Sequence, residues 1–230
     1  MTGKYAILID GGYFTKVFQS ELQHYPTAVE VKQCVERIRQ AGELANAELL
    51  RVYFYDAPPL QACVTNPIDG HIIDLGKSDL AKNAKRLQSD LSLSPFFALR
   101  SGELKLKQSW KIKSSVWNRV KAISTTQAED IQHDEIQQQT PRSTVVYATD
   151  IQPDITQKGV DLKIGIDIAC MALRHAADII ILVSGDTDLV PALKMARKEG
   201  VRVCCTQLGT RKLTDLLRIH SDCIIGVDLA

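Results

Sequence analysis

Four aspartates stand where predicted strands end or where a predicted helix begins, and carboxylates in such places can bind a cation. They are Asp10, Asp161, Asp186 and Asp188. The first follows an apolar run at residues 4–9 (KYAILI), and the last two follow a run at 179–183 (IIILV). The remaining aspartate opens an apolar segment typical of a buried helix. If the two strands are neighbours in a parallel sheet, all four carboxylates converge at one edge of it.

Carboxylates gathered in this way need compensation, because two unit charges about 4 Å apart repel by about 4 kcal/mol at an effective dielectric near 20. Either some of the acids are protonated or a hard divalent cation neutralises them. A ligand set of oxygens without His or Cys favours Mg²⁺ or Mn²⁺ over zinc. Such a centre suits phosphodiester hydrolysis by a metal-activated water. Taken singly, each aspartate is more often a helix cap or a turn residue.

A fifth acid, Asp167, lies six positions after Asp161 on the same predicted helix. At about 100° per residue it points roughly 120° away, so both cannot face one site equally. We interpret Asp167 as a buried, hydrogen-bonded acid behind the four candidate ligands.

Apolar and amphipathic segments must position these acids. Strands are expected at residues 4–9, 49–55, 179–183, 201–205 and 223–227. Helices are expected at residues 13–22, 28–41, around 71–91, 158–176, 189–198 and 213–219. Strands that alternate with helices and short loops predict an α/β fold, in which a parallel sheet is covered on both faces.

The middle of the chain departs from this alternation. Residues 96–106 (FFALRSGELKL) have strand-like composition around a Ser-Gly turn signal. Residues 121–143 are polar and rich in glutamine, which predicts a surface excursion that buries little. We therefore expect a single domain over residues 1–230 with an inserted, β-rich and basic segment at about 96–156.

Basic residues concentrate between residues 70 and 121, where eleven cations and four acids give a net charge of +7. The candidate RNA-binding residues there are Lys107, Lys111, Lys113 and Trp110. Lysines that alternate with tryptophans suit a single strand, because the charges follow phosphates and the indoles stack on bases. A β-hairpin with its lysines turned outward gives the same pattern.

Composition excludes several classes of protein. With 28 basic and 27 acidic residues the net charge is +1, so any contact with nucleic acid must be local. No apolar run approaches the roughly 20 residues that span a bilayer, and the start of the chain does not read as an export signal. The six cysteines form no C-x-x-C pair and sit mostly in apolar segments. We expect them to be reduced core residues of a cytoplasmic protein.

Five segments together resemble the NYN domain family of the PIN-like nucleases, and they occur in the family's order. They are YAILIDGGY (5–13), YFYDAPP (53–59), RSGELKL (100–106), QKGVDLKIGID (157–167) and LVSGDTDLVP (182–191). The resemblance implies a three-layer α/β/α fold and a Mg²⁺- or Mn²⁺-dependent ribonuclease site formed by the four aspartates above. Ser184 falls where PIN-like sites often carry a small polar residue near the scissile phosphate. Some relatives have Asn shortly after the first aspartate, where this chain has Gly11, Gly12 and Tyr13.

These observations lead to an expected function, an endoribonuclease that cleaves RNA with Mg²⁺ or Mn²⁺. RNA is the expected partner, no membrane contact is expected, and a homo-oligomer is allowed. The alternative is an RNA-binding or regulatory NYN module with weak or no catalytic activity. A haloacid-dehalogenase-type phosphatase is disfavoured, because it requires a second aspartate at the position of Gly12. The sequence shows no Ser-His or Cys-His pair for covalent catalysis.

Overall fold

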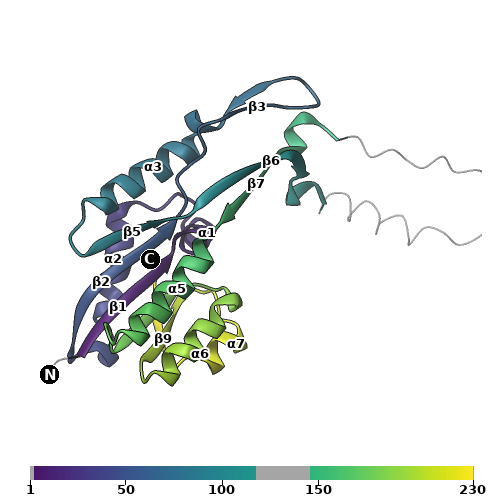
Figure 1. Cartoon of the computed structure of the whole chain (residues 1–230). Coiled ribbons are helices and arrows are strands. Elements are labelled where there is room, and N and C mark those ends of the chain that lie inside the picture. The colour runs from purple at the N-terminus through teal and green to yellow at the C-terminus, as the bar shows by residue number, and fades with distance from the viewer. Residues whose placement is uncertain (1–2, 118–145, 230) are drawn as a thin grey trace, which may run out of the picture.

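The central element of the computed structural model is a six-stranded sheet in the order β10-β9-β8-β1-β2-β5, with every pair of neighbours parallel (Figure 1). The structure describes residues 3–117 and 146–229. The strands of this sheet are β1 (Gly3–Asp10), β2 (Ala47–Asp56), β5 (Phe97–Ser101), β8 (Ile179–Val183), β9 (Arg202–Leu208) and β10 (Cys223–Val227). The parallel α/β fold that the sequence predicts is therefore confirmed.

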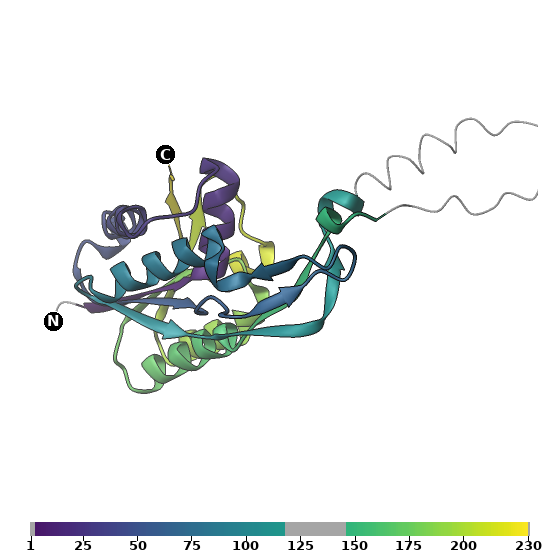
Figure 2. The same cartoon turned by 90° about the horizontal axis from the view of Figure 1, so that it is seen from above.

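Helices cover both faces of the sheet, so that three layers result (Figure 2). On one face lie α1 (Gly11–Leu22), α2 (Ala28–Arg39) and α3 (Asp79–Ser92); on the other lie α5 (Val160–Leu173), α6 (Val190–Lys198) and α7 (Asp215–Ile219). Side chains of β1 alternate between the two cores: Ile7 and Ile9 enter the first, whereas Leu8 enters the second. Burial on both faces explains why β1 and β8 are continuously apolar.

The strand β1 pairs with both β2 and β8, which places the ends of all three at one edge of the sheet. Ile9 lies opposite Val183 of β8, and Asp10 lies opposite Tyr55 of β2. The chain leaves β1 directly into α1, and Gly11 makes this turn fit. A Cβ on Gly11 would lie 2.8 Å from the Tyr55 carbonyl oxygen and from the Phe54 ring.

A second, antiparallel sheet of two strands leads away from the central layer (Figure 1). It pairs β6 (Glu103–Ile112) with β7 (Ile151–Lys158). The chain passes from β5 to β6 at Gly102, where a Cβ would lie 2.6 Å from Val160. The inserted β-rich segment was expected to begin at about residue 96, but β5 is part of the central sheet, and the second sheet begins at Glu103. The strand β7 was not predicted from the sequence, because Pro153 is typical of the end of a strand. In the structure Pro153 lies opposite Trp110, beside a register shift, where proline is tolerated.

Short elements complete the described chain. The strands β3 (Cys63–Thr65) and β4 (Ile72–Asp74) form a small antiparallel pair. Four 3-10 turns are η1 (Gly42–Leu44), η2 (Leu75–Lys77), η3 (Ala148–Asp150) and η4 (Thr187–Leu189). The glutamine-rich stretch at 121–143 lies outside the described residues. Among the helices that the structure describes, none has the length and apolar character to cross a bilayer.

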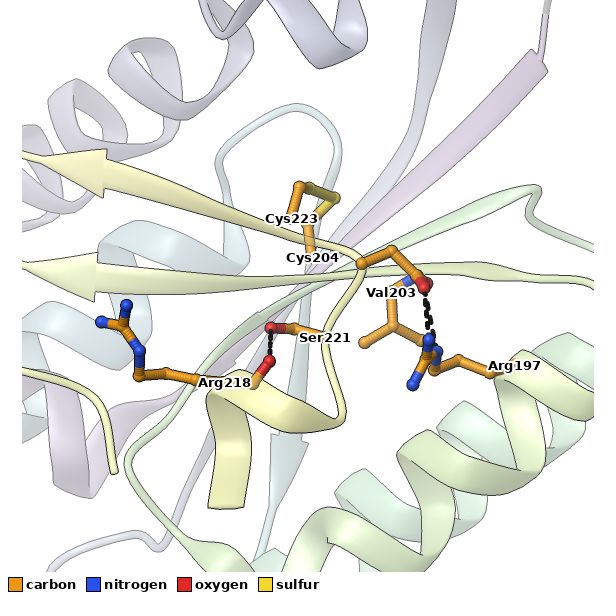
Figure 3. Close-up of a disulfide and its surroundings, with 7 residues drawn as sticks. Arg197, Val203, Cys204, Arg218, Ser221 and Cys223 are labelled. Atoms are coloured by element: carbon orange, nitrogen blue, oxygen red, sulfur yellow. Dashed lines mark hydrogen bonds and ion pairs between the residues drawn. A yellow bond between two sulfur atoms is a disulfide. The ribbon is translucent and has the colours of Figure 1, made fainter. Parts of the chain in front are cut away.

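One expectation about the cysteines is wrong, because Cys204 and Cys223 form a disulfide (Figure 3). The two residues lie directly opposite each other on β9 and β10, with their Cα atoms 4.7 Å apart. Spacing in the sequence could not reveal this pair, since it arises from the register of two strands. The turn before β10 is held by Asp222, which accepts hydrogen bonds from Arg197 and from the Val203 backbone. The other four cysteines are free thiols.

Candidate active site

Asp10 ends β1 and is buried, and both of its carboxylate oxygens accept hydrogen bonds. The Tyr13 backbone N–H donates to Oδ1 over 3.1 Å, which caps helix α1. The Ser184 hydroxyl donates to Oδ2 over 3.0 Å. Burial raises the pKa of Asp10 despite these bonds, and the negative charge of Asp186 adds to the rise. Asp10 is thus a carboxylate whose charge is under-compensated by the protein itself.

Ser184 connects Asp10 to the turn that carries the later acids. Its side chain is fully buried, and its Oγ accepts the Asp186 backbone N–H over 3.1 Å. The next position, Gly185, lies under the Tyr13 ring and has no room for a side chain, since a Cβ there would lie 2.5 Å from that ring. Asp186 in turn accepts the Asp188 backbone N–H over 2.9 Å and caps η4. Asp186 therefore has the capping role that is expected of a single aspartate, and this role uses only its Oδ1 atom.

Asp161 reaches the same place from the first turn of α5. Gly159 precedes this helix with φ of 78°, a backbone conformation that favours glycine, and Val160 is buried in the core. Partial burial raises the pKa of Asp161, followed by the charges of Asp186, Asp10 and Asp188. A carboxylate whose pKa is raised by three others lies within their electrostatic reach.

Three of the four predicted ligands line one pocket of about 330 Å³, namely Asp10, Asp161 and Asp186. Asp188 is exposed and does not line it, although its charge acts on Asp161. In the described ranges 3–117 and 146–229, no three His, Cys, Asp or Glu side chains stand at the mutual spacing of metal ligands. The acids therefore share a pocket without being gathered into a finished coordination sphere.

Two cations at this pocket were missed by the sequence reasoning. Lys16 and Arg211 line it together with Tyr13 and Gln157. The sequence could have indicated Lys16, because it lies one helical turn after Gly12 in the helix that follows Asp10. Arg211 had none, because it comes from the loop after β9 and reaches the pocket only in the folded chain, with its guanidinium 5.9 Å from the centre of the Tyr13 ring.

The loop that carries Arg211 is fixed to α1 by Glu21. The Glu21 Oε1 atom accepts the Thr210 backbone N–H over 2.7 Å and the Thr210 hydroxyl over 2.8 Å. Because Thr210 adjoins Arg211, this contact positions the cation at the pocket.

Asp56 is a further acid at this edge, one residue beyond the partner of Asp10 in β2. Burial raises its pKa, and the charge of Asp10 adds to the rise. The side chain of Gln88 donates to Oδ2 over 2.9 Å. The signal that singled out Asp10, an acid at the end of an apolar strand, applied equally to Asp56.

Asp167 lies on the other side of α5, and its partners are not the candidate ligands. The Tyr55 hydroxyl donates to its Oδ2 over 2.9 Å, and the Arg100 guanidinium forms an ion pair with it over 3.0 Å. Arg100 also lies 5.4 Å from the centre of the Tyr53 ring. Asp167 is hydrogen-bonded as expected, but it is only half-buried and joins α5 to β2 and β5, so its support of the four candidate ligands stays a prediction.

The predicted RNA-binding residues lie on or beside β6 and do not line the acidic pocket. Lys107 and Lys111 are exposed, and both pair with Asp154 of β7, over 3.5 and 2.6 Å. Lys111 and its neighbours hold the pKa of Asp154 below its usual range. Trp110 is half-buried, and so is Lys113. Two of these three lysines are therefore already engaged by a carboxylate of the chain.

One comparison with known proteins, the family model of the NYN domain, agrees with the sequence motifs. The family model of the NYN domain matches residues 112–222, which include Asp161, Asp186 and Asp188 but not Asp10. The match confirms the resemblance to this nuclease-like family. No curated protein sequence matches the chain. A crystal structure of a protein of unknown function from Vibrio parahaemolyticus is similar at 11% identity and a TM-score of 0.49, over 99% of this chain and 94% of that one.

Proposed function

We propose that this protein, whose residues 112–222 match the family model of the NYN domain, is a Mg²⁺- or Mn²⁺-dependent endoribonuclease. The observation that carries the proposal is the pocket at the carboxyl edge of the sheet. Three carboxylates from β1, α5 and the turn after β8 line it, and two cations, Lys16 and Arg211, line it as well. Acids beside cations suit a phosphodiester, because the cations attract the phosphate while the acids hold a metal ion or move a proton.

The residues present fit a hard divalent cation. The donor set consists of carboxylate oxygens, and burial, followed by the negative charges of neighbouring aspartates, raises the pKa values of Asp10 and Asp161. Asp10, Asp161 and Asp186 would hold the ion, with Asp188 beside them. When bound, such a cation supplies charge neutralisation at the phosphate and eases the ionisation of water.

The chain's own residues then have separate tasks. Ser184 donates to Asp10 and accepts from the Asp186 backbone, so it keeps two ligand-bearing segments in register. Lys16 and Arg211 bind the non-bridging oxygens of the phosphate. The proton of an attacking water would pass to a carboxylate that does not hold the ion, and Asp188, exposed beside the three ligands, is the one left free for this task.

The alternative, an RNA-binding or regulatory module without strong catalysis, has two observations in its favour. Within the part of the chain that is described, the acids are not gathered at ligand spacing. The Gly-Gly-Tyr sequence after Asp10 also lacks the Asn that some relatives carry there.

A cleavage assay separates the two functions. Single-stranded RNA with a 5′ label is incubated with Mn²⁺ and with wild type, Asp10→Asn or Asp90→Asn. Asp90 is an exposed acid on α3, whose loose ion pair with Arg86 spans 3.9 Å, so its variant controls for the lost charge. Cleavage by wild type and Asp90→Asn but not by Asp10→Asn supports the nuclease. RNA binding by all three without cleavage supports the regulatory module.

The cytoplasmic location and the presence of a homo-oligomer remain predictions. The disulfide offers a check of the first, because structural disulfides are rare in reducing compartments. Thiol counting on protein recovered from cells under alkylating conditions would decide it.

A further inference from the structure

A second cavity of about 270 Å³ adjoins the acidic pocket. Gly12 and Lys16 line both, so the two hollows share one wall. The walls of the second cavity are mostly apolar side chains from α3, β6, β7 and the segment between β2 and α3. They include Leu60, Leu75, Leu80, Ala84, Leu104 and Ile155.

Polar side chains are the minority of the residues that line this cavity. Asp56 lines it with a carboxylate that accepts from Gln88 and from the Ala57 backbone and still has free lone pairs. Tyr25 also lines it, and burial raises the pKa of its hydroxyl to about 12, so it is neutral at physiological pH. The cavity therefore offers apolar surfaces together with a carboxylate acceptor.

We propose that this cavity binds the nucleobase of a nucleotide whose phosphate lies at Lys16. The inference rests on the proposed function and adds a subsite to it. A nucleobase has apolar faces and an edge of N–H donors and acceptors, which fits a cavity with apolar walls and a carboxylate acceptor. Lys16 stands at the boundary between the cavities, and among the described residues no ion pair to it is found.

The adjacency of the cavities is what favours a nucleotide over an unrelated apolar ligand. Phosphate and base of one nucleotide are joined through a single ribose, so adjoining hollows of opposite character can hold both. Gly12 lines both cavities and leaves room at their boundary, because a Cβ there would lie 3.1 Å from the Gln157 side chain and 3.5 Å from Asp10.

Methyl NMR of the full chain with ¹³C-labelled leucine and alanine tests this inference without any cleavage. The probes are the four nucleoside 5′-monophosphates in metal-free buffer, with ribose 5-phosphate as the matched ligand that lacks a base. The expected result is that at least one nucleotide shifts the methyl signals of Leu80, Ala84 and Leu104, whereas ribose 5-phosphate leaves them in place. Equal shifts with both ligands, or nucleotide shifts confined to other methyls, would overturn the proposal.

A pair of variants sharpens the test. Leu80 is 62% exposed and lines the cavity, whereas Leu93 is 82% exposed just after the same helix and does not line it. We expect Leu80→Ala to weaken nucleotide binding at least threefold and Leu93→Ala to leave it unchanged. An equal effect of both, or of neither, refutes the subsite.

The outcome is separable from that of the cleavage assay. Nucleotide shifts at the cavity in a protein that cleaves no RNA would reject the nuclease and keep the subsite. Cleavage without such shifts would reject the subsite alone.

Discussion

The variant Asp161→Asn should be more stable than wild type when metal is absent and less stable than wild type when Mn²⁺ is bound. Asp161 lies on the first turn of α5, where partial desolvation of its carboxyl group, followed by the charges of three neighbouring aspartates, raises its pKa. The change removes one negative charge and keeps the shape of the side chain. Without metal the variant should be the more stable protein, because like charges no longer repel.

The metal-free gain should be small, since exposed charge pairs contribute at most about 1 kcal/mol. At Mn²⁺ concentrations near 100 times its dissociation constant, wild type gains about 2.7 kcal/mol in free energy of unfolding. A variant that binds tenfold more weakly gains about 1.4 kcal/mol less. The loss with metal thus exceeds the gain without it, and the order of stability changes.

The pH dependence has a defined sign. A carboxyl whose pKa is higher in the folded state contributes most to stability when protonated, and this contribution is lost as pH rises through the folded pKa. The metal-free advantage of Asp161→Asn should therefore be present at pH 7 and vanish below the ordinary aspartate pKa of 3.8.

Urea unfolding of wild type, Asp161→Asn and Asp90→Asn, each with EDTA and with Mn²⁺, measures these differences. If Asp161→Asn lowers stability in EDTA and responds to Mn²⁺ as wild type does, Asp161 is a structural residue of α5 and not a ligand. Asp90→Asn should follow wild type in both buffers.

Three further changes have expected outcomes. Asp154→Asn releases two lysines of β6, so RNA should bind more tightly. The slope of log K against log salt concentration, measured by fluorescence anisotropy, should become more negative by up to about 1.4. An unchanged slope would show that RNA binds elsewhere. Ser184→Ala removes the hydrogen-bond partner of the Asp10 Oδ2 atom and of the Asp186 backbone N–H, and it should cost about 1–3 kcal/mol in unfolding free energy. Replacing Cys204 and Cys223 by alanine should cost about 3 kcal/mol for a separation of 19 residues, and unreduced, denatured wild type should titrate as four thiols; six thiols would show that the bond is absent.

Much of the fold could be predicted from local pattern. The runs that became β1 and β8 are apolar because both faces of a central parallel strand are buried, and this requirement is visible in any such run. The same rule placed Asp10 and Asp186 at one edge of the sheet, and both line the acidic pocket. It could also have indicated Asp56, which ends β2.

Other features depended on which distant segments meet. Strand β7 formed despite Pro153, because pairing with β6 satisfied its backbone around a register shift. The direction of the Asp188 side chain was decided by the turn η4, which leaves it exposed. The disulfide arose from the register of β9 and β10, which no cysteine spacing encodes.

By itself the sequence determined that an acidic edge would exist, because burial imposes a local periodicity and parallel strands end together. Only the tertiary structure decided what accompanies the acids there. Arg211 reaches Tyr13 through a loop held by Glu21, whose contact with Thr210 joins residues 189 positions apart. The composition of the pocket was therefore a matter of packing between remote segments, which act on each other only once the chain has folded.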